Sequence, residues 1–303
     1  MLLEKIIGDL IETNTLYNRL YHKTTDMKKT IIFIIASLML VACERNPVVP
    51  DESPTHRVPG RPLVDGTVIK NAATDYDGNI YDAVVIGKQV WMQSNLRTTH
   101  YADGTEIPLE SEVTDSIACY YYDGDGQDIA NYGYFYNWKA VMRDSPATGA
   151  NPSGVQGICP AGWHVPSSAE WAQLRDYLYS KPQYHICDQP HVAKALASDT
   201  GWNSYNPDMD IANPHHILCC VGNSHYPNNA TGFSAYPAGF YGAFYYGCYT
   251  ACIGGSAHFW STTEYQNVSV EQVSGCQLSY ASPLVNGAGN SKGFGYSVRC
   301  LRD

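Results

Sequence analysis

The sequence has few charged residues and lacks several familiar motifs, and these absences argue against whole classes of protein. Only 16% of the 303 residues are Asp, Glu, Lys or Arg, and Lys and Arg together number 19. The net charge is −10, and no basic block occurs outside the N-terminal region, which argues against a nucleic-acid partner. The sequence also contains no CxxC pair, no HExxH motif and no glycine-rich phosphate loop, which would mark zinc or nucleotide sites.

Tyrosine and glycine are abundant instead, with 24 Tyr against 7 Phe, and 26 Gly. The apolar fraction of 44% is close to that of globular proteins, which argues against wholesale disorder. Frequent glycine and aromatic residues with few long charged side chains favour short strands and loops over long helices. The chain is long enough for one large domain or two ordinary ones.

The N-terminal region has the pattern of a bacterial lipoprotein signal. Two lysines at 28–29 precede an apolar run at 31–41, and the run ends in Leu-Val-Ala-Cys at Cys43. This run is too short to span a bilayer, which needs ~20 residues. We therefore expect residues 27–43 to be a signal peptide and Cys43 to receive a diacylglyceryl group. The alternative is a buried helix that ends in a cysteine by chance.

The segments on either side of this signal are not expected to fold with the domain. Residues 1–26 carry four acids, which is unusual before a signal peptide, so we interpret them as an over-extension upstream of a start at Met27. Residues 44–62 contain five prolines, which block helices and disfavour sheets. We interpret them as an extended tether for a domain over residues 63–303. The expected location is the cell envelope, in the outer membrane by preference, with the leaflet left open.

The clearest helix signal follows a Cys-Pro-Ala-Gly-Trp-His-Val-Pro segment at 159–166. Ser167 and Glu170 form a capping box, and apolar residues recur with helical spacing over residues 171–178. We expect short strands over residues 83–86, 89–92 and 293–300, and a weaker second helix over residues 191–197.

Several motifs, in order along the chain, resemble those of the Fibrobacter succinogenes major paralogous domain family. The most specific is the segment at 159–166. The others are short pieces at residues 77–81, 86–92, 95–97, 136–138, 231–234, 259–261 and 297–300. Together they cover the chain from about residue 65 to residue 303. The resemblance implies an exported protein, commonly a lipoprotein, but it supplies no reaction because the function of the family is largely uncharacterised.

The order of elements also resembles, more loosely, C-type-lectin-like and formylglycine-generating-enzyme-like domains. This resemblance implies an α+β fold: a single irregular domain of short antiparallel strands, long Gly- and aromatic-rich loops and one or two helices. It also implies a disulfide between a cysteine beside the helix and one in the last strand, here Cys159 and Cys300. Such a bond would close a loop of ~140 residues and contribute ~4–5 kcal/mol in the entropic account of disulfides.

Nine cysteines remain once Cys43 is set aside for the lipid, and export makes disulfides chemically feasible. Because nine is odd, at least one thiol is free or pairs outside the chain. The sequence leaves open the pairing of Cys119, Cys187, Cys219, Cys220, Cys248, Cys252 and Cys276. Cys248 and Cys252 invite comparison with the paired active-site cysteines of formylglycine-generating enzymes, but their spacing is one residue short of that pattern. A disulfide or two idle thiols is the favoured interpretation.

Two clusters have metal-ligand chemistry. Asp123, Asp125 and Asp128 offer carboxylates to calcium, although the loop lacks the glycine and glutamate of an EF-hand, and a solvated acidic turn is the alternative. The zinc-type donors are His185, Cys187, His215, His216, Cys219 and Cys220. Loop histidines and disulfides are the favoured interpretation of that second set. We expect no cofactor, and calcium is the one ion that the sequence leaves open.

The remaining chemistry lies in two tyrosine-rich stretches, residues 120–138 and 236–249. Exposed tyrosines are rigid, amphipathic recognition surfaces, and their rings stack on sugars. The candidate ligand-binding residues are Tyr121, Tyr122, Tyr241, Tyr245 and Tyr246, and a role in the core is the alternative for each. A Gly-x-Ser-x-Gly match at 289–293 has no histidine after it, so we reject a hydrolase elbow there.

These observations predict a lipid-anchored cell-envelope protein with a non-catalytic, lectin-like or adhesin-like binding domain. Its partners would be the membrane, through the lipid on Cys43, and a glycan or a surface protein. One alternative is a formylglycine-generating-like enzyme that uses Cys248 and Cys252. The other is a structural subunit of a surface assembly.

Overall fold

The computed structural model describes residues 66–122, 129–186, 191–205, 218–224, 226–245, 247–265 and 272–303. The chain divides into two compact units, Met1–Val48 and Val49–Asp303, and every described residue belongs to the second. The expected signal peptide, Cys43 and the proline-rich tether therefore lie outside the described residues. Within the described part of the chain, no helix is both long enough and apolar enough to cross a bilayer.

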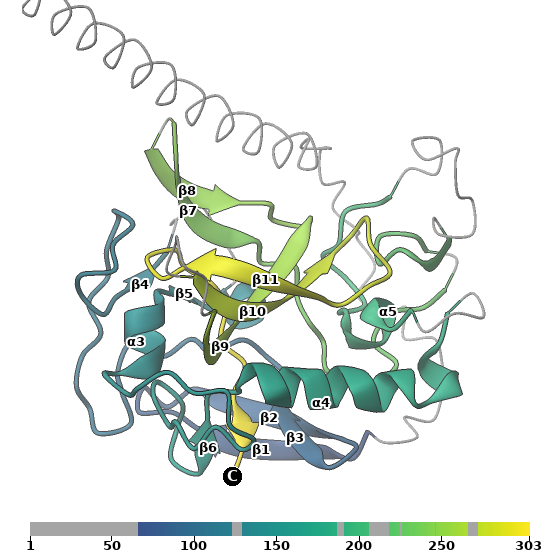
Figure 1. Ribbon diagram of the computed structural model, residues 1–303, viewed down its shortest axis with the longest axis horizontal. Helices are drawn as coiled ribbons and strands as arrows, with labels where there is room; N and C mark the ends of the chain where they lie inside the picture. Colours follow the sequence, from purple (N-terminus) through teal and green to yellow (C-terminus); the bar gives the residue numbers. More distant parts are fainter. Residues whose placement is uncertain are drawn as a thin grey trace, which may run out of the picture. The chain divides into compact units, whose positions relative to one another are not determined.

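Two antiparallel sheets and two hairpins organise this unit (Figure 1). The larger sheet runs, in spatial order, through β1 (Val68–Thr74), β2 (Ile80–Ile86), β3 (Gln89–Met92), β12 (Leu301–Arg302) and β6 (Trp163–His164). The smaller sheet runs through β11 (Asn286–Ser291), β10 (Gln272–Ser279) and β9 (Ser256–Tyr265). The hairpins pair β4 (Tyr120–Tyr121) with β5 (Phe135–Tyr136), and β7 (Phe240–Phe244) with β8 (Gly247–Ala251).

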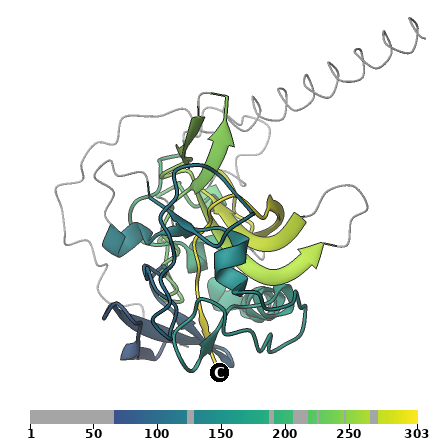
Figure 2. The ribbon, with the colours of Figure 1, turned by 90° about the vertical axis from the view of Figure 1, so that its left-hand side faces the viewer.

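The described helices are few and mostly short. They are α2 (Ile129–Tyr132), α3 (Trp138–Met142), α4 (Ser168–Tyr179) and α5 (Ala193–Leu196), with a 3-10 turn at Pro182–Tyr184. Antiparallel strands with few helices agree with the prediction of a single α+β domain, although a mostly-β description fits them as well. In both ribbon views the five-stranded sheet lies at one end of this unit and the β7–β8 hairpin lies toward the other (Figure 2).

Helix α4 forms where the capping box predicts it. The Ser167 hydroxyl accepts a hydrogen bond from the Glu170 amide, and the Glu170 carboxylate accepts one from the Ser167 amide. One core cluster contains Trp171, Leu174 and Leu178 of α4, Val84, Ile86 and Trp91 of the larger sheet, and Phe259 and Leu278 of the smaller sheet. The helix thus packs between the two sheets, as Figure 1 shows.

The chain ends differently from the sequence prediction of a strand over residues 293–300. Isolated bridges form instead, from Gly295 to Tyr241, from Tyr296 to Tyr136 and from Ser297 to Phe259, and the last strand is β12. Successive residues of this segment bond to different elements, so no single neighbour continues a regular ladder. The segment therefore connects the β4–β5 hairpin, the β7–β8 hairpin and β9.

A disulfide joins Cys159, ahead of β6, to Cys300, directly before β12. Sequence reasoning paired the same two residues, and the bond spans a sequence separation of 141 residues. Cys219 and Cys252 are also disulfide-bonded, whereas Cys248 is a free thiol. Cys248 and Cys252 are therefore not bonded to each other, and Cys252 has no thiol to serve as a nucleophile. Cys119 and Cys276 are buried free thiols, and Cys187 lies outside the described residues.

Candidate functional site

Tyr121 and Tyr241 are core residues, which corrects their prediction as ligand-binding residues. They are 0% and 4% exposed, and their rings stack on each other with centroids 4.6 Å apart. Both hydroxyls donate to backbone carbonyl oxygens, at 2.8 and 2.6 Å. Successive side chains of a strand point to opposite faces, so a run of three tyrosines sends its middle member inward. Tyr120 and Tyr122 on either side stay partly exposed.

The other candidates divide between exposed residues and residues outside the described part of the chain. Tyr122 is half-buried and Tyr245 is 81% exposed. The candidates that lie outside the described residues are Tyr246, Asp123, Asp125, Asp128, His215 and His216. In the part of the chain that the structure describes, no three His, Cys, Asp or Glu side chains are grouped so that they could hold a metal ion.

Partly exposed tyrosines gather beside the turn that joins β1 to β2. Tyr76, in this turn, is 59% exposed, and its ring lies 5.3 Å from the imidazole of His100. The ring of Tyr134 packs against those of Tyr120 and Tyr122, at 4.8 and 5.8 Å between centroids. We call these four tyrosines, together with Asp77 and His100, the tyrosine surface.

Asp77 lies in the turn with Tyr76, and its negative charge also acts on Tyr120 and Tyr134. Partial burial is the main cause that raises the pKa of the Tyr120 and Tyr134 phenols, and the negative charge of Asp77 raises both further. Asp77 therefore lies close enough to affect both rings. The phenols stay protonated at neutral pH and can donate hydrogen bonds to a ligand.

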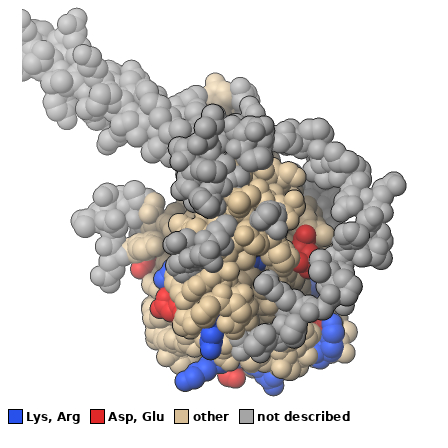
Figure 3. Space-filling view, turned by 90° about the vertical axis from the view of Figure 1, so that its right-hand side faces the viewer, with Lys and Arg blue, Asp and Glu red and all other residues tan. Residues whose placement is uncertain are grey.

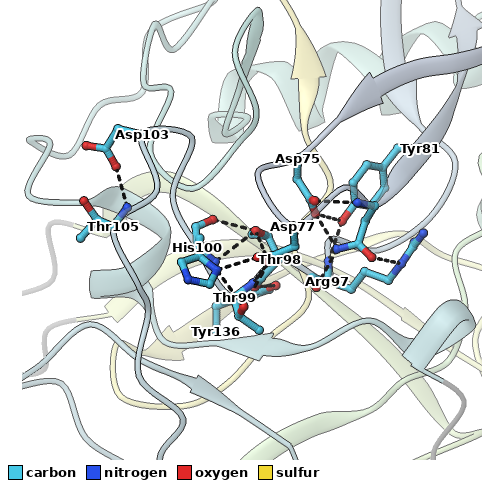
Figure 4. A network of polar contacts seen from close by, with 11 residues as sticks. Asp75, Asp77, Tyr81, Arg97, Thr98, Thr99, His100, Asp103, Thr105 and Tyr136 are labelled. Carbon is cyan, nitrogen blue, oxygen red and sulfur yellow. Dashed lines mark hydrogen bonds and ion pairs between the residues drawn. The ribbon is translucent and has the colours of Figure 1, made fainter.

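Asp77 accepts several hydrogen bonds from one short segment, residues 98–100 (Figure 4). Its carboxylate accepts from the Thr98 hydroxyl at 3.0 Å, from the amide and hydroxyl of Thr99, and from His100 Nδ1 at 2.6 Å. Burial raises the pKa of Asp77, but these bonds outweigh it and hold the pKa below its ordinary value. The carboxylate is therefore ionised, and both of its oxygens accept hydrogen bonds from protein donors.

His100 is held by Asp77 through one of its two ring nitrogens. An ionised carboxylate can only accept, so Nδ1 carries the proton that it donates to Asp77. No hydrogen bond from Nε2 to a described residue is formed, and the side chain is about one-third exposed. This is the arrangement in which a carboxylate fixes the orientation of an imidazole. Nε2 of His100 can then hydrogen-bond to a group that rests on the ring of Tyr76.

Asp75, a buried residue of the same turn, supports the tyrosine surface through hydrogen bonds. It is buried, and it accepts hydrogen bonds from the Tyr81 hydroxyl at 2.6 Å and from both the amide and the side chain of Asn79 at 2.9 Å. The Tyr81 hydroxyl accepts in turn from the amide of Arg97, at 3.0 Å. Asp75 acts through Tyr81 and Asp77 acts directly, and together they hold residues 97–100 against the turn between β1 and β2 (Figure 4). This arrangement places His100 next to Asp77.

A second polar cluster surrounds His164 at the end of the larger sheet. Nε2 of His164 lies 2.8 Å from Glu170, and Nδ1 lies 2.7 Å from Asp303, the last residue. Burial lowers the pKa of His164, but the two carboxylates outweigh it and raise the pKa above its ordinary value. A cavity of about 450 Å³ adjoins this cluster. Both nitrogens of the imidazole are therefore engaged, and His164 links Asp303 to Glu170 of α4.

In a third cluster, four oxygen atoms surround the ammonium group of Lys194. The ammonium of Lys194 is buried and donates to the carbonyl oxygens of Val221, Asn223 and Tyr226 and to the side-chain oxygen of Asn228. Burial lowers the pKa of Lys194 to about 8. An oxygen cage of this kind suits a metal cation, but the ammonium fills it.

Of the tyrosine surface, sequence reasoning chose Tyr122 as a binding residue, placed Tyr120 and Tyr134 in the same tyrosine-rich stretch, and considered Asp77 only as part of an acidic turn. It did not single out Tyr76 or His100. Alternation along β4 would have favoured Tyr120 and Tyr122 over Tyr121. No comparable signal links Asp77 to His100, because the contact depends on how the turn and the segment after β3 fold together.

Comparison with known proteins gives one finding. The family model for the Fibrobacter succinogenes major domain matches residues 84–302, more than half of the chain. This is the family that the sequence motifs resemble. No curated protein and no solved structure matches the chain.

Proposed function

The chain belongs to the Fibrobacter succinogenes major domain family, and from this premise we propose that it is a lipid-anchored cell-envelope protein that binds a glycan without catalysis. The binding site is the tyrosine surface. The observation that carries the proposal is the exposed ring of Tyr76 beside His100, whose Nε2 faces away from Asp77.

A sugar ring needs two kinds of contact, and the tyrosine surface offers both. Its C–H faces pack on aromatic rings, which Tyr76, Tyr122 and Tyr134 provide. Its hydroxyls need hydrogen-bond partners, which the tyrosine hydroxyls and His100 Nε2 provide. A sugar would be held by these groups, and in this proposal calcium is not required.

What supports a non-catalytic role is that two of the described candidate reactive groups are already engaged. Cys252 is disulfide-bonded and both nitrogens of His164 are occupied. What supports a C-type-lectin-like arrangement is the position of α4 between two antiparallel sheets, together with the disulfide that ties Cys159 to the end of the chain. The finer fold assignment is part of the proposal.

A glycan array tests the binding function. The chain would carry the substitution Cys43→Ser, so that it is not lipidated, and would be screened in calcium and again in EDTA. We expect binding that persists in EDTA. Binding that EDTA abolishes would move the site to Asp123, Asp125 and Asp128, and the absence of binding in both conditions would refute a glycan ligand.

The lipid anchor has a separate test. Mass spectrometry of the protein from membranes should find a diacylglyceryl-modified Cys43 at the mature N-terminus. A peptide from residues 1–26, or an unmodified Cys43 within a longer chain, would contradict this part of the proposal.

A further inference from the structure

A cavity of about 230 Å³ lies between α4 and the smaller sheet. One wall belongs to α4 and contains Ser168, Trp171, Ala172 and Arg175. The facing wall is formed by residues of β9, β10 and β11, with Val285 directly before β11. Pockets for drug-sized ligands usually measure ~300–1,000 Å³. The cavity is therefore of a size for one small molecule and not for an oligosaccharide.

A glycine on β11 leaves room for this cavity. Gly287 is paired with Cys276 of β10, and cross-strand partners project to the same face of a sheet. Cys276 packs in the core cluster that contains Leu174 of α4, so this face is the one that meets the helix. A Cβ atom built on Gly287 would make only ordinary contacts, the nearest at 3.6 Å from the Tyr265 hydroxyl. Glycine within a strand is one mark of a place where a ligand or another backbone approaches closely.

Two polar side chains that line the cavity are more than nine-tenths buried. Ser274 and Cys276 stand two residues apart on β10, so both project to the face that meets α4, and they are 7% and 4% exposed. The carbonyl oxygen of Ser274 accepts a hydrogen bond from Ser261. Neither the Ser274 hydroxyl nor the Cys276 thiol is hydrogen-bonded to a described residue. Burying a hydroxyl without a partner is costly, and a ligand that accepts its hydrogen bond removes that cost.

Arg175 is the one charged residue among the described residues that line the cavity. Its side chain is 35% exposed, and the nearest carboxylate oxygen, on the 72%-exposed Asp176, lies 3.9 Å from Nε. An exposed pair of this kind contributes little. Burial raises the pKa of the Cys276 thiol to about 12, and the positive charge of Arg175 acts in the opposite direction. The guanidinium therefore lies close enough to act on the buried wall of the cavity.

Other charges leave Arg175 as the cation of this cavity. Glu264 lies between Thr263 and Tyr265, which line the cavity, so alternation along β9 sends its side chain to the opposite face. Its carboxylate pairs with Lys292 at 2.7 Å. On the coloured part of the face in Figure 3, most of the few Lys and Arg side chains lie toward the lower end with acidic side chains among them, and they form no broad basic patch. Contact with one guanidinium, and not a field of positive charge, would select an anion.

We propose that this cavity binds the carboxylate of a small molecule through Arg175. A guanidinium presents parallel N–H donors that match the two oxygens of a carboxylate. One cation balances one negative charge, whereas a phosphate brings nearly two. The Ser274 hydroxyl and the exposed amide of Asn286 can bond to the rest of the molecule, and the ring of Trp171 offers an apolar wall.

The required group occurs in two kinds of molecule of this size, an acidic monosaccharide and an amino acid. The cavity shares no residue with the tyrosine surface, so its ligand does not depend on the proposed glycan function. The shared chemistry is the carboxylate, and the probes below separate its two sources.

Calorimetric titration tests this with the full chain carrying Cys43→Ser. The probes are D-glucuronate and N-acetylglycine, and their uncharged counterparts are D-glucose and N-acetylglycinamide. We expect at least one carboxylate to bind and its uncharged counterpart to bind at least tenfold more weakly, since a charge-assisted pair is lost. The tighter of the two carboxylates identifies the source.

Two substitutions test the assignment to this cavity. Arg175→Gln should weaken carboxylate binding at least tenfold, whereas Arg302→Gln, at an exposed arginine outside the cavity, should change it less than twofold. Gly287→Val fills the cavity from β11 and should weaken binding about as much as Arg175→Gln. Urea denaturation shows whether each variant is folded. Where Gly287→Val is not folded, Arg175→Gln decides, because its position is partly exposed.

Four results would overturn the inference. Neither carboxylate binds, the uncharged counterparts bind equally well, Arg175→Gln binds as its parent does, or inorganic phosphate binds more tightly than both carboxylates. Tyr134→Ala is measured in parallel, because Tyr134 belongs to the tyrosine surface, and it should keep the affinity of the parent for both carboxylates. Loss of carboxylate binding in Tyr134→Ala alone would assign the ligand to the tyrosine surface and refute this inference without refuting the glycan proposal.

Discussion

The guanidinium Nε of Arg299 donates a 2.7 Å hydrogen bond to the side-chain oxygen of Asn95, a residue 204 positions earlier in the chain. Both side chains are buried. The same guanidinium donates to the carbonyl oxygens of Met92, Phe233 and Ser234, at 2.9, 2.6 and 2.6 Å. Three motifs that mark the family, at residues 95–97, 231–234 and 297–300, therefore meet at one buried cation.

Removing this cation should destabilise the domain strongly. Arg299→Met fills similar space but removes the donor from four acceptors, three of them in buried contacts, and each uncompensated buried group costs about 1–3 kcal/mol. We expect the free energy of unfolding in urea to fall by at least ~3 kcal/mol. Arg302→Met, at an exposed neighbouring position, is the control and should change it by less than ~0.5 kcal/mol. If both variants lowered the free energy of unfolding equally, the hydrogen bonds of Arg299 would not stabilise the domain.

The disulfide between Cys159 and Cys300 should contribute strongly to the free energy of unfolding. Changing both residues to Ser releases a loop with a sequence separation of 141 residues and should lower the free energy of unfolding by ~4–5 kcal/mol. Urea denaturation measures the change, and Cys248→Ser, at a free thiol, is the control. A double variant as stable as its parent would mean that the unfolded chain is not restricted by this bond.

His164 should make stability depend on pH in a defined direction. Its pKa is raised in the folded state above the ordinary ~6.5, because Glu170 and Asp303 favour the imidazolium. The stabilisation is therefore complete below pH ~6.5 and is lost as the pH rises through the folded-state pKa. In urea denaturation at a series of pH values, His164→Gln should lack this decline. The control His185→Gln should keep it, since the imidazole of His185 hydrogen-bonds to the carbonyl oxygen of Tyr179 and not to a carboxylate. The same decline in His164→Gln would assign it to another group.

Gly104 should control the position of Tyr76 in the proposed binding site. A Cβ atom built on Gly104 would lie 2.7 Å from Cζ of Tyr76, so Gly104→Ala must displace that ring. Gly154→Ala is the matched control, because Gly154 has a similar positive φ but open space around it. Both variants should lose about 1 kcal/mol of stability from backbone strain. Only Gly104→Ala should also weaken glycan binding, and an unchanged affinity would remove Tyr76 from the site.

The sequence predicted the parts of the fold that depend on local patterns. The capping box of Ser167 and Glu170 and the apolar spacing that follows placed α4 within a residue, and the strands beside Gly87 fell at β2 and β3. Contacts between distant residues were not predictable in the same way. The Arg299–Asn95 bond and the failure of residues 293–300 to form a regular strand both arise from tertiary packing.

The candidate site was predicted less well than the fold. The choice of Tyr121 with Tyr122 ignored the alternation of a strand, which necessarily buries one of two consecutive side chains. The family motifs did not help, because residues such as Asn95, Phe233 and Arg299 build the core and carry no information about a ligand. The Asp77–His100 pair joins residues 23 positions apart through a turn, and composition does not reveal such a contact.

The most direct test of the account is a calorimetric titration of the strongest array glycan against variants of Tyr134, the ring that contacts both Tyr120 and Tyr122. Tyr134→Ala should weaken binding at least tenfold, roughly the loss expected for an aromatic anchor. Tyr134→Phe, which keeps the ring, should restore most of the affinity, and Tyr265→Ala should bind as the parent does. A Tyr134→Ala variant that is folded and binds with full affinity would contradict the tyrosine surface as the glycan site.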